Sequence, residues 1–219
     1  AIVGESGSGK SVTSKAILGI LAGNAIIEGG EILYDGQDLL KIGEDDFYKI
    51  RGDKISMIFQ DALSALNPVM TVGKQLDEIF IRHMKMTKKE AREHSVEALR
   101  MVGVPDPERR YKAFPHELSG GMRQRVLIAM AFACSPDLII ADEPTTALDV
   151  TIQAQVLGVL SDMQKQSGTG LLLITHDLSV VVHMADEINV MYCGKIVEKG
   201  TTREVFLDPL HPYTKGLIG

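Results

Sequence analysis

Residues 4–11 of the chain have the sequence Gly-Glu-Ser-Gly-Ser-Gly-Lys-Ser, which matches the pattern G-x-x-x-x-G-K-S at every fixed position. In such a loop the glycines let the backbone curl until successive N–H groups point at phosphate oxygens. An apolar stretch precedes the loop and a helical pattern follows it, so a helix N-terminus adds partial positive charge. The pattern therefore predicts a site for the phosphates of a nucleotide. The loop residues assigned to it are Gly4, Ser6, Gly7, Ser8, Gly9, Lys10 and Ser11.

Two side chains of this loop have specific chemistry. The Lys10 ammonium should reach the β- and γ-phosphates of ATP, and the Ser11 hydroxyl should be a ligand of Mg²⁺. A chance glycine-rich turn is the alternative. The lysine, the hydroxyl and the position between a strand and a helix all favour nucleotide binding.

The second motif is an apolar run at residues 138–141 that ends in Asp142 and Glu143. A buried strand that ends in a carboxylate brings Asp142 to the phosphate end of the sheet, where it can hold Mg²⁺. Glu143 is then placed to polarise an attacking water molecule. A solvated acid at a strand end is the alternative for Glu143, but its position after Asp142 in a chain with this loop favours catalysis.

The third motif is Leu-Ser-Gly-Gly-Met at residues 118–122, before a helical stretch at residues 125–134. Ser119, Gly120 and Gly121 can form a second anion-binding helix start from a hydroxyl and backbone N–H groups. A plain helix cap is the alternative. The motif resembles the signature sequence of ATP-binding-cassette ATPases, and the resemblance covers nearly the whole chain. Three further residues of the chain occur in the order expected for that family: Gln60, Asp149 (in Ala147-Leu148-Asp149) and His176 (in Ile174-Thr175-His176-Asp177).

This resemblance implies that two such domains sandwich two ATP molecules head to tail. Ser119 and Gly121 would then touch the γ-phosphate that Lys10 of the partner subunit holds. Asp149 would lie at the junction between the subunits, and a plain helix N-cap is its alternative.

The resemblance also implies roles for two residues near the γ-phosphate. Gln60 would sense that phosphate and Mg²⁺, as a ligand of the ion, and would connect to a transmembrane partner. His176 would donate a hydrogen bond to the γ-phosphate and orient the catalytic centre.

Three local features resemble the dipeptide and oligopeptide importer group, which includes nickel importers. They are residues 59–61 with 66–68 (Phe-Gln-Asp and Leu-Asn-Pro), residues 115–117 (Pro-His-Glu) and residues 211–214 (His-Pro-Tyr-Thr). One departure is Ala62, where the group often has proline. The resemblance implies an ATPase subunit that couples ATP hydrolysis to import of dipeptides or oligopeptides through a separate membrane permease. A nickel importer is the alternative within the group.

A cassette ATPase that works without a membrane partner is a further alternative. Gln60 and Ser119 are 59 positions apart (119 − 60 = 59), which leaves room only for a compact helical subdomain. Neither a heptad run nor a cysteine cluster interrupts the sequence, unlike in the repair and chromosome-organising relatives. A transporter subunit is therefore the favoured interpretation.

The implied partners are a second ATPase subunit, identical or different, and transmembrane permease subunits. An extracytoplasmic substrate-binding protein would act indirectly. We expect a peripheral protein at the cytoplasmic face of a bacterial membrane. The formal net charge of −6 argues against a protein that coats nucleic acid.

Apolar runs alternate with amphipathic stretches, which predicts an α/β fold. We expect a P-loop NTPase core whose parallel sheet is covered by helices, plus an inserted helical subdomain. The core would comprise residues 1–69 and 136–219, and the subdomain residues from about 70 to 135. Two helices are expected between Thr71 and Val102, with a break near Met86 and Thr87.

Cys134 and Cys193 both lie in apolar stretches. They are predicted to be buried free thiols of a reducing compartment, rather than a disulfide or a metal site. The first apolar run is short, so we expect the chain to be a piece of a longer protein. The aromatic residue that stacks on adenine in this family would then lie upstream of Ala1.

Overall fold

The computed structural model describes residues 1–146 and 148–218, so Ala147 of the predicted Ala147-Leu148-Asp149 motif lies outside the described residues. The described residues form two units. The first comprises Ala1–Arg51 and the chain from Leu172 onward, and the second comprises Gly52–Leu171.

A sheet forms the core of the first unit. Its strands are neighbours in the order β6, β1, β7, β8. Strand β1 (Ile2–Val3) pairs in parallel with β6 (Gly170–Thr175), whose last residues belong to this unit, and with β7 (Glu187–Tyr192). Strand β8 (Lys195–Thr201) is antiparallel to β7. The predicted parallel sheet thus carries an antiparallel edge strand. The side chains of Val3, Ile174 and Val190 are completely buried.

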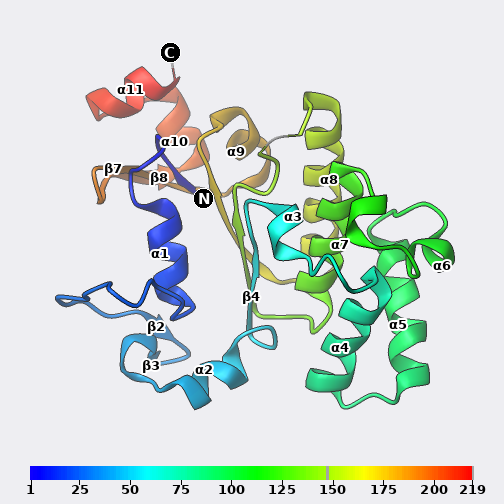
Figure 1. Cartoon of the computed structure of the whole chain (residues 1–219). Coiled ribbons are helices and arrows are strands. Elements are labelled where there is room, and N and C mark those ends of the chain that lie inside the picture. The colour runs from blue at the N-terminus through cyan, green and yellow to red at the C-terminus, as the bar shows by residue number, and fades with distance from the viewer. Residues whose placement is uncertain (147, 219) are drawn as a thin grey trace. The chain divides into compact units, whose positions relative to one another are not determined.

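Short helices and a hairpin complete this unit (Figure 1). They are α1 (Lys10–Ile17), β2 (Leu33–Tyr34), β3 (Gln37–Asp38), the 3-10 helix η1 (Leu39–Lys41), α2 (Glu44–Ile50), α9 (Leu178–Met184), α10 (Thr202–Leu207) and α11 (Pro212–Ile218). Helix α1 ends soon after the phosphate loop because Gly19 adopts a φ of +63°. The Phe47 ring packs so closely on Gly19 that an added Cβ would lie 2.5 Å from it.

The second unit contains the parallel strands β4 (Ile55–Ile58) and β5 (Leu138–Asp142). Ile55 pairs with Leu138, and Ile58 pairs with Ala141. The residues that follow the two strands therefore leave the pair at the same edge. The helices of this unit are α3 (Ala62–Ala65), α4 (Val72–Met84), α5 (Lys88–Met101), α6 (Pro107–Arg110), the 3-10 helix η2 (Pro115–Glu117), α7 (Gly120–Phe132) and α8 (Val150–Ser167).

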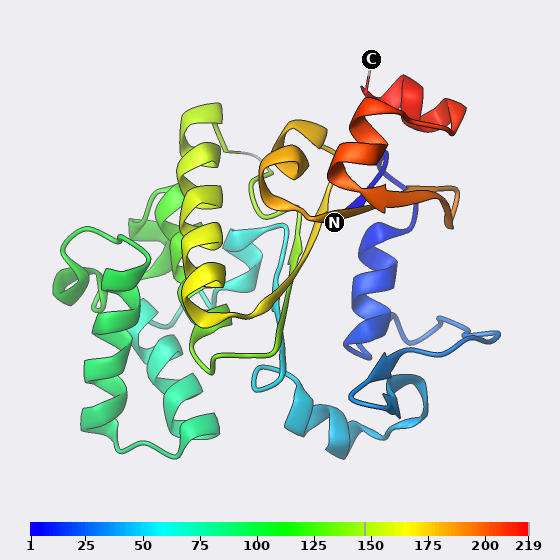
Figure 2. The same cartoon turned by 180° about the vertical axis from the view of Figure 1, so that it is seen from behind.

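The two helices expected between residues 71 and 102 are confirmed as α4 and α5, which lie side by side in Figures 1 and 2. Thr71 caps α4, and Thr87 with Glu90 forms a capping box at the start of α5. Lys85, in the left-handed region at a φ of +56°, ends the first helix. Local backbone chemistry therefore sets the predicted break.

A polar network ties α4, α5 and the residue after α6 together. One oxygen of Asp77 accepts a hydrogen bond from Ser95 Oγ at 2.7 Å, and the other accepts one from Tyr111 Oη at 2.5 Å. Burial, together with this bond to the Asp77 carboxylate, raises the pKa of Tyr111 to about 12. The network fixes the spacing of the helices because both Asp77 oxygens have defined donors.

All described elements between Val72 and Phe132 are helical. Both predicted subdomain boundaries, near residues 70 and 135, fall inside the second unit, which also contains β4, β5 and α8. The inserted helical subdomain stays a prediction.

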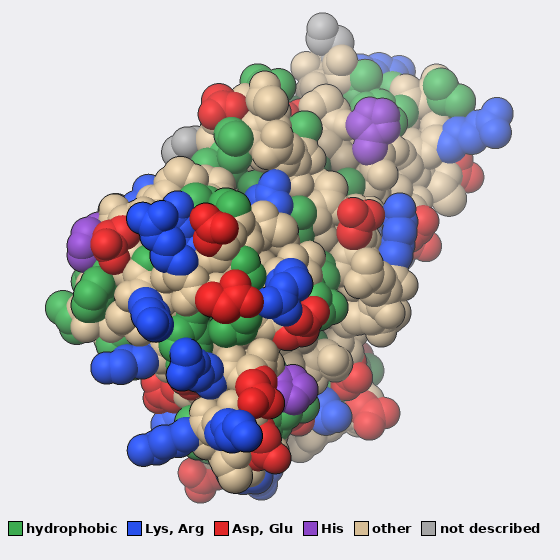
Figure 3. Space-filling model, turned by 90° about the vertical axis from the view of Figure 1, so that its right-hand side faces the viewer, with side chains coloured by type: hydrophobic (Ala, Val, Ile, Leu, Met, Phe, Trp, Pro, Cys, Tyr) green, Lys and Arg blue, Asp and Glu red, His purple; other side chains and the backbone are tan. Residues whose placement is uncertain are grey.

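Lys and Arg side chains are interspersed with Asp and Glu side chains on the face that Figure 3 shows. That face carries no continuous basic surface of the kind that binds a nucleic-acid backbone. Among the described residues, no helix combines the length and the apolar character needed to cross a bilayer.

The prediction that both cysteines are buried is wrong. Cys193 is exposed, because it lies with Gly194 in the turn between β7 and β8 and has a φ of +47°. Cys134 is partly buried, in the segment that follows α7. The apolar residues around Cys193 did not reveal that the strand ends before it and that Cys193 lies in the turn.

Candidate nucleotide-binding site

The predicted phosphate loop, residues 4–11, follows β1 and leads into α1, as its sequence requires. We call these eight residues the cradle. Gly4 has a φ of +154°, and an added Cβ would lie 2.2 Å from the carbonyl oxygen of Met191 on β7. Only glycine fits there, because any side chain would force the loop off the sheet. A backbone bond from Gly194 N–H to the Ser8 carbonyl oxygen, 2.9 Å long, supports the loop from the β7–β8 turn.

The interior of the cradle carries donors that suit an anion. Lys10 is 4% exposed, and its ammonium donates to the carbonyl oxygens of Gly4 at 2.7 Å and Glu5 at 2.9 Å. Ser8 Oγ is buried and has no hydrogen-bond partner among the described residues. Helix α1 starts from Gly9 without a side-chain cap. An orphaned hydroxyl and uncapped helix N–H groups are satisfied by phosphate oxygens, so the cradle fits a nucleotide.

Two tyrosines that the motif analysis did not assign to the cradle lie against it. Tyr213 Oη accepts a hydrogen bond from the Glu5 N–H at 2.8 Å. The Tyr213 ring packs on Tyr192 with centroids 4.5 Å apart. The predicted His-Pro-Tyr-Thr motif thus starts α11 and holds the outside of the cradle. Only the three-dimensional fold connects positions 5 and 213.

His176 belongs to the same unit as the cradle. Thr175, the last residue of β6, pairs with Val3, the last residue of β1. His176 and Gly4 are therefore the next residues of two neighbouring parallel strands and leave the sheet at the same edge. This placement agrees with the predicted position of His176 near the γ-phosphate.

Glu143 and Gln60 lie together in the second unit. Gln60 Nε2 donates a hydrogen bond to Glu143 Oε2 at 2.8 Å, and Thr146 Oγ1 donates to the same oxygen at 2.9 Å. The pairing of β4 with β5 explains this contact, because Gln60 and Glu143 each follow the paired ends of the strands by the same number of residues. Thr146 was not predicted.

The backbone of Glu143 adopts a φ of +47°. A non-glycine residue in this region costs about 1–3 kcal/mol, and such strain gathers at functional sites. It turns the side chain of Glu143 away from the course of β5 and toward Gln60. The candidate catalytic carboxylate is therefore held by its backbone and by two donors.

The predicted Mg²⁺ ligands are all oxygen donors. They are the hydroxyl of Ser11, the carboxylate of Asp142 and the side-chain carbonyl of Gln60, whose Nε2 is engaged by Glu143. Asp142 is 4% exposed and ends β5. Hard oxygen donors are the type that Mg²⁺ prefers, so each of these side chains suits the ion by its chemistry.

Ser119 is the N-cap of α7, and Gly120 and Gly121 are its first residues. The helix therefore begins five residues before Arg125, where the sequence predicted its start. Ser119 caps it by accepting a hydrogen bond from Met122 N–H at 3.4 Å. Gly121 packs so tightly on α8 that an added Cβ would lie 2.5 Å from Ile152 Cγ2. The motif therefore forms the predicted helix start, on a tightly packed pair of helices.

Asp149 caps α8, accepting a hydrogen bond from Ile152 N–H at 3.0 Å. Asp149 therefore acts as a helix N-cap, which was the alternative interpretation of this residue. Its place at a subunit junction stays a prediction.

A hollow of about 310 Å³ in the second unit brings several of these segments together. It is lined by Gln60, Gly120 and Thr146, among others. Gln124, from the first turns of α7, also lines it, is 3% exposed, and has a buried Nε2 without a hydrogen-bond partner among the described residues. Gln124 is thus a further candidate site residue, which the sequence motifs did not single out. The residues after β4, the residues after β5 and the start of α7 therefore share one hollow.

The comparisons with known proteins agree with this geometry. Residues 1–146 match the family model described as "ABC transporter". The chain is 56% identical over 219 residues to the oligopeptide transport ATP-binding protein OppD of Bacillus subtilis, and 54% identical over 220 residues to the dipeptide transport ATP-binding protein DppD of the same organism. Both matches cover 100% of the chain, which spans 61% and 66% of the length of these relatives.

Solved structures show the same fold. The dimeric ATP-binding cassette MJ0796, in a post-hydrolysis state bound to ADP and Pi, superposes with a TM-score of 0.80 at 30% identity, over 92% of this chain and 84% of that one. The protein cbiO1 of Clostridium perfringens, part of the ABC transporter complex cbiONQ, superposes with a TM-score of 0.80 at 29% identity, over 94% of this chain and 78% of that one. The predicted α/β P-loop fold is confirmed. This chain belongs to the ABC transporter family.

Proposed function

We propose that this chain binds and hydrolyses ATP and thereby powers import of dipeptides or oligopeptides through a separate membrane permease. The observation that carries the ATPase part is the Glu143 carboxylate, held by Gln60 and Thr146 at the end of the strand that also presents Asp142. The peptide part rests on the 56% and 54% identity to peptide-transport subunits.

The cradle binds the triphosphate. Lys10 is already positioned by the carbonyl oxygens of Gly4 and Glu5, so little side-chain ordering is needed when phosphate arrives. The N–H groups at the start of α1 and the Ser8 hydroxyl supply further donors. Ser11, Asp142 and Gln60 would hold Mg²⁺, which neutralises charge on the phosphates when bound.

Glu143 acts as the general base. It accepts a proton from the attacking water while the hydrogen bonds from Gln60 and Thr146 keep its carboxylate oriented. His176 stabilises the γ-phosphate oxygens by hydrogen bonding, since it leaves the sheet at the edge where the cradle begins.

The working form is a dimer of ATPase subunits, with a second copy or a related chain as the mate. Ser119 and Gly121, at the exposed N-terminus of α7, contact the γ-phosphate held by Lys10 of the partner subunit. The relative MJ0796 is dimeric in its solved structure. The protein acts at the cytoplasmic face of a bacterial membrane, bound to permease subunits, while an extracytoplasmic binding protein delivers the cargo.

The experiment is an uptake assay with the full-length protein and its copurified permease in proteoliposomes. We expect ATP-dependent uptake of short peptides, lost in Glu143→Gln and retained in Glu93→Gln, an exposed control on α5. Uptake of Ni²⁺ instead of peptide would overturn the cargo assignment. ATP hydrolysis with no copurified permease would indicate a cassette that works without a membrane partner.

A further inference from the structure

Three potential metal ligands from separate segments of the second unit lie together. They are the carboxylate of Asp53, the imidazole of His83 and the thiol of Cys134, whose ligand atoms all lie within 4.8 Å of one another. Asp53 lies in the turn before β4, His83 in the last turn of α4, and Cys134 in the segment that joins α7 to β5. All three side chains are partly buried.

Mixed nitrogen, sulfur and oxygen donors of this kind suit a borderline divalent transition-metal ion. We propose that Asp53, His83 and Cys134 form a binding site for such an ion, for example Zn²⁺. Three protein ligands leave the fourth tetrahedral position for water. Ligands at about 2.0–2.3 Å from zinc lie about 3.5 Å apart, so the ligand atoms need to approach one another by no more than about 1.3 Å when the ion binds.

The backbone near each ligand is fixed by local interactions. Gly52, with a φ of +81°, faces the ring, and a Cβ there would lie 3.3 Å from His83 Nε2. Gly52 N–H donates to the Ile55 carbonyl oxygen at 2.9 Å and closes the turn that carries Asp53. Ser135 N–H donates to the Phe132 carbonyl oxygen at 2.9 Å and closes the turn that carries Cys134. Asp53 and Cys134 therefore lie on defined turns, and His83 lies on the last turn of α4.

The ligand atoms are also available. Within residues 1–146 and 148–218, neither the Asp53 carboxylate nor the His83 ring takes part in a hydrogen bond or an ion pair. His83 lies at the C-terminal end of α4, where the helix dipole favours positive charge.

The cluster is separate from the nucleotide-binding residues of the same unit. Asp53 precedes β4 and Gln60 follows it, while Cys134 precedes β5 and Glu143 follows it. The cluster thus lies at the opposite edge of this strand pair. Helix α7 has 13 residues between Ser119 and Ala133, so it keeps the two ends about 20 Å apart.

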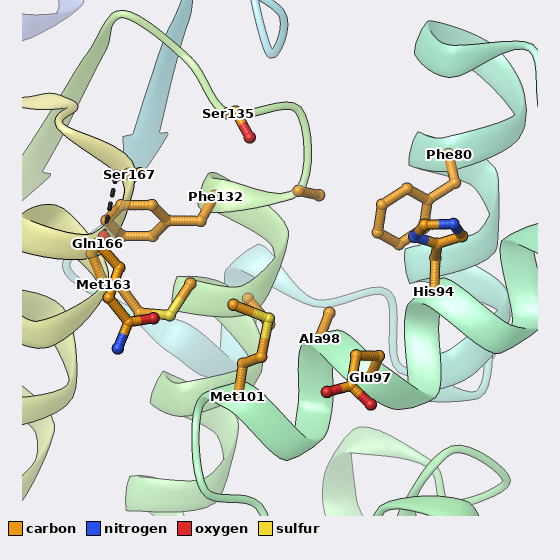
Figure 4. Close-up of a pocket in the computed structure, with 12 residues that line it drawn as sticks. Phe80, His94, Glu97, Ala98, Met101, Phe132, Ser135, Met163, Gln166 and Ser167 are labelled. Atoms are coloured by element: carbon orange, nitrogen blue, oxygen red, sulfur yellow. Dashed lines mark hydrogen bonds between the residues drawn. The ribbon is translucent and has the colours of Figure 1, made fainter.

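An open cavity of about 400 Å³ borders two of the three segments (Figure 4). Phe80, one turn before His83, lines it, as do Ala133 and Ser135, the chain neighbours of Cys134. Its other lining residues come mainly from α5, α7 and α8. The cavity lies next to the cluster in sequence, but Asp53, His83 and Cys134 are not among its lining residues.

An ion at this position would link the turn before β4, the end of α4 and the end of α7. The three ligands come together only in the folded chain. The ion would therefore bind the folded state and stabilise it against unfolding. This inference concerns stability and metal binding and is independent of the proposed transport function.

The test is a titration of the reduced, chelator-treated chain with Co²⁺, which reports tetrahedral thiolate ligation by its absorption bands. We expect one thiolate-ligated ion per chain, competed off by Zn²⁺. Cys134→Ser should remove the thiolate-to-metal band. His83→Gln and Asp53→Asn should each weaken binding at least about tenfold. The matched control is Cys193→Ser, which should leave the spectrum and the affinity unchanged because Cys193 lies in the first unit.

Circular dichroism of each variant checks folding, and a rise in Tm with Zn²⁺ is measured in parallel. If Cys134→Ser does not fold, the Co²⁺ affinities of His83→Gln and Asp53→Asn provide the test. The proposal is overturned if the native chain shows no thiolate band at saturating Co²⁺. It is also overturned if the folded ligand variants bind Co²⁺ as tightly as the native chain.

Discussion

The hydroxyl of Tyr213 accepts a hydrogen bond from the backbone N–H of Glu5 at 2.8 Å, which joins α11 to the phosphate cradle across 208 positions of sequence. The bond satisfies a loop N–H on the outside of the cradle. The Tyr192 ring supports the Tyr213 ring from the β7 side. The shape of the cradle therefore depends on the C-terminal segment as well as on its own glycines.

Tyr213→Phe should weaken ATP binding about fivefold, because a net loss of about 1 kcal/mol is typical for one hydrogen bond. The maximal hydrolysis rate should change less than the KM, since Tyr213 lies on the outside of the loop. Equilibrium binding of a fluorescent ATP analogue measures the effect. Tyr192→Phe is the matched control, because it keeps the aromatic pair and lacks a bond to the cradle. Equal losses in both variants would contradict the assigned role.

Gly4→Ala should abolish ATP binding. The new Cβ would lie 2.2 Å from the Met191 carbonyl oxygen, and the φ of +154° is itself unfavourable for alanine. We expect a loss of at least about 2 kcal/mol in unfolding free energy, measured by urea denaturation. Gly23→Ala, where an added Cβ meets nothing within 4 Å, should stay within about 0.5 kcal/mol of the native chain. A stable Gly4→Ala variant that binds ATP would refute the close approach to β7.

Asp77→Ala should lower the unfolding free energy by about 2 kcal/mol, because it leaves the hydroxyls of Ser95 and Tyr111 without their acceptor. Chemical denaturation measures the change. Glu78→Ala, the exposed neighbour on the same helix, should change stability by no more than about 0.5 kcal/mol. Similar values for the two variants would show that the network adds no stability.

Alkylation of Cys134 should be slow near neutral pH and should accelerate with pH. Burial, and then the nearby Asp53 carboxylate, raises the pKa of the Cys134 thiol from 9.0 to about 11. The thiolate is the reactive form, so the rate should rise about tenfold per pH unit from about pH 8 to about pH 10. Mass spectrometry of a Cys193→Ser chain, with chelator present, follows the reaction. A rate that levels off near pH 9 would show an unshifted thiol.

Much of this architecture could be predicted because short sequence patterns carry it. The cradle depends on glycine spacing, and the break between α4 and α5 depends on the capping residues Thr87 and Glu90. The apolar runs before Asp142 and His176 each predict a strand, and the structure has β5 and β6 at these positions. These features are local, and their physical causes can be recognised in a few consecutive residues.

Other features depend on contacts between distant positions. Gln60 bonds to Glu143, 83 positions away, only because β4 pairs with β5. Asp53 and Cys134 are 81 positions apart (134 − 53 = 81), and no spacing pattern connects them. The exposure of Cys193 follows from a turn that an apolar run did not reveal. Sequence patterns alone could not find these relationships because tertiary packing creates them.

The central proposal is that the cradle of one subunit and the Ser119–Gly121 turn of its mate hold ATP between them. Light scattering during size-exclusion chromatography of Glu143→Gln with ATP tests it most directly, because this variant should bind ATP without hydrolysing it. We expect a dimer that forms only with ATP and is lost when Ser119→Glu, which adds a repelling carboxylate at the helix start, is introduced. A monomer at saturating ATP, or a dimer that Ser119→Glu leaves intact, would contradict the account.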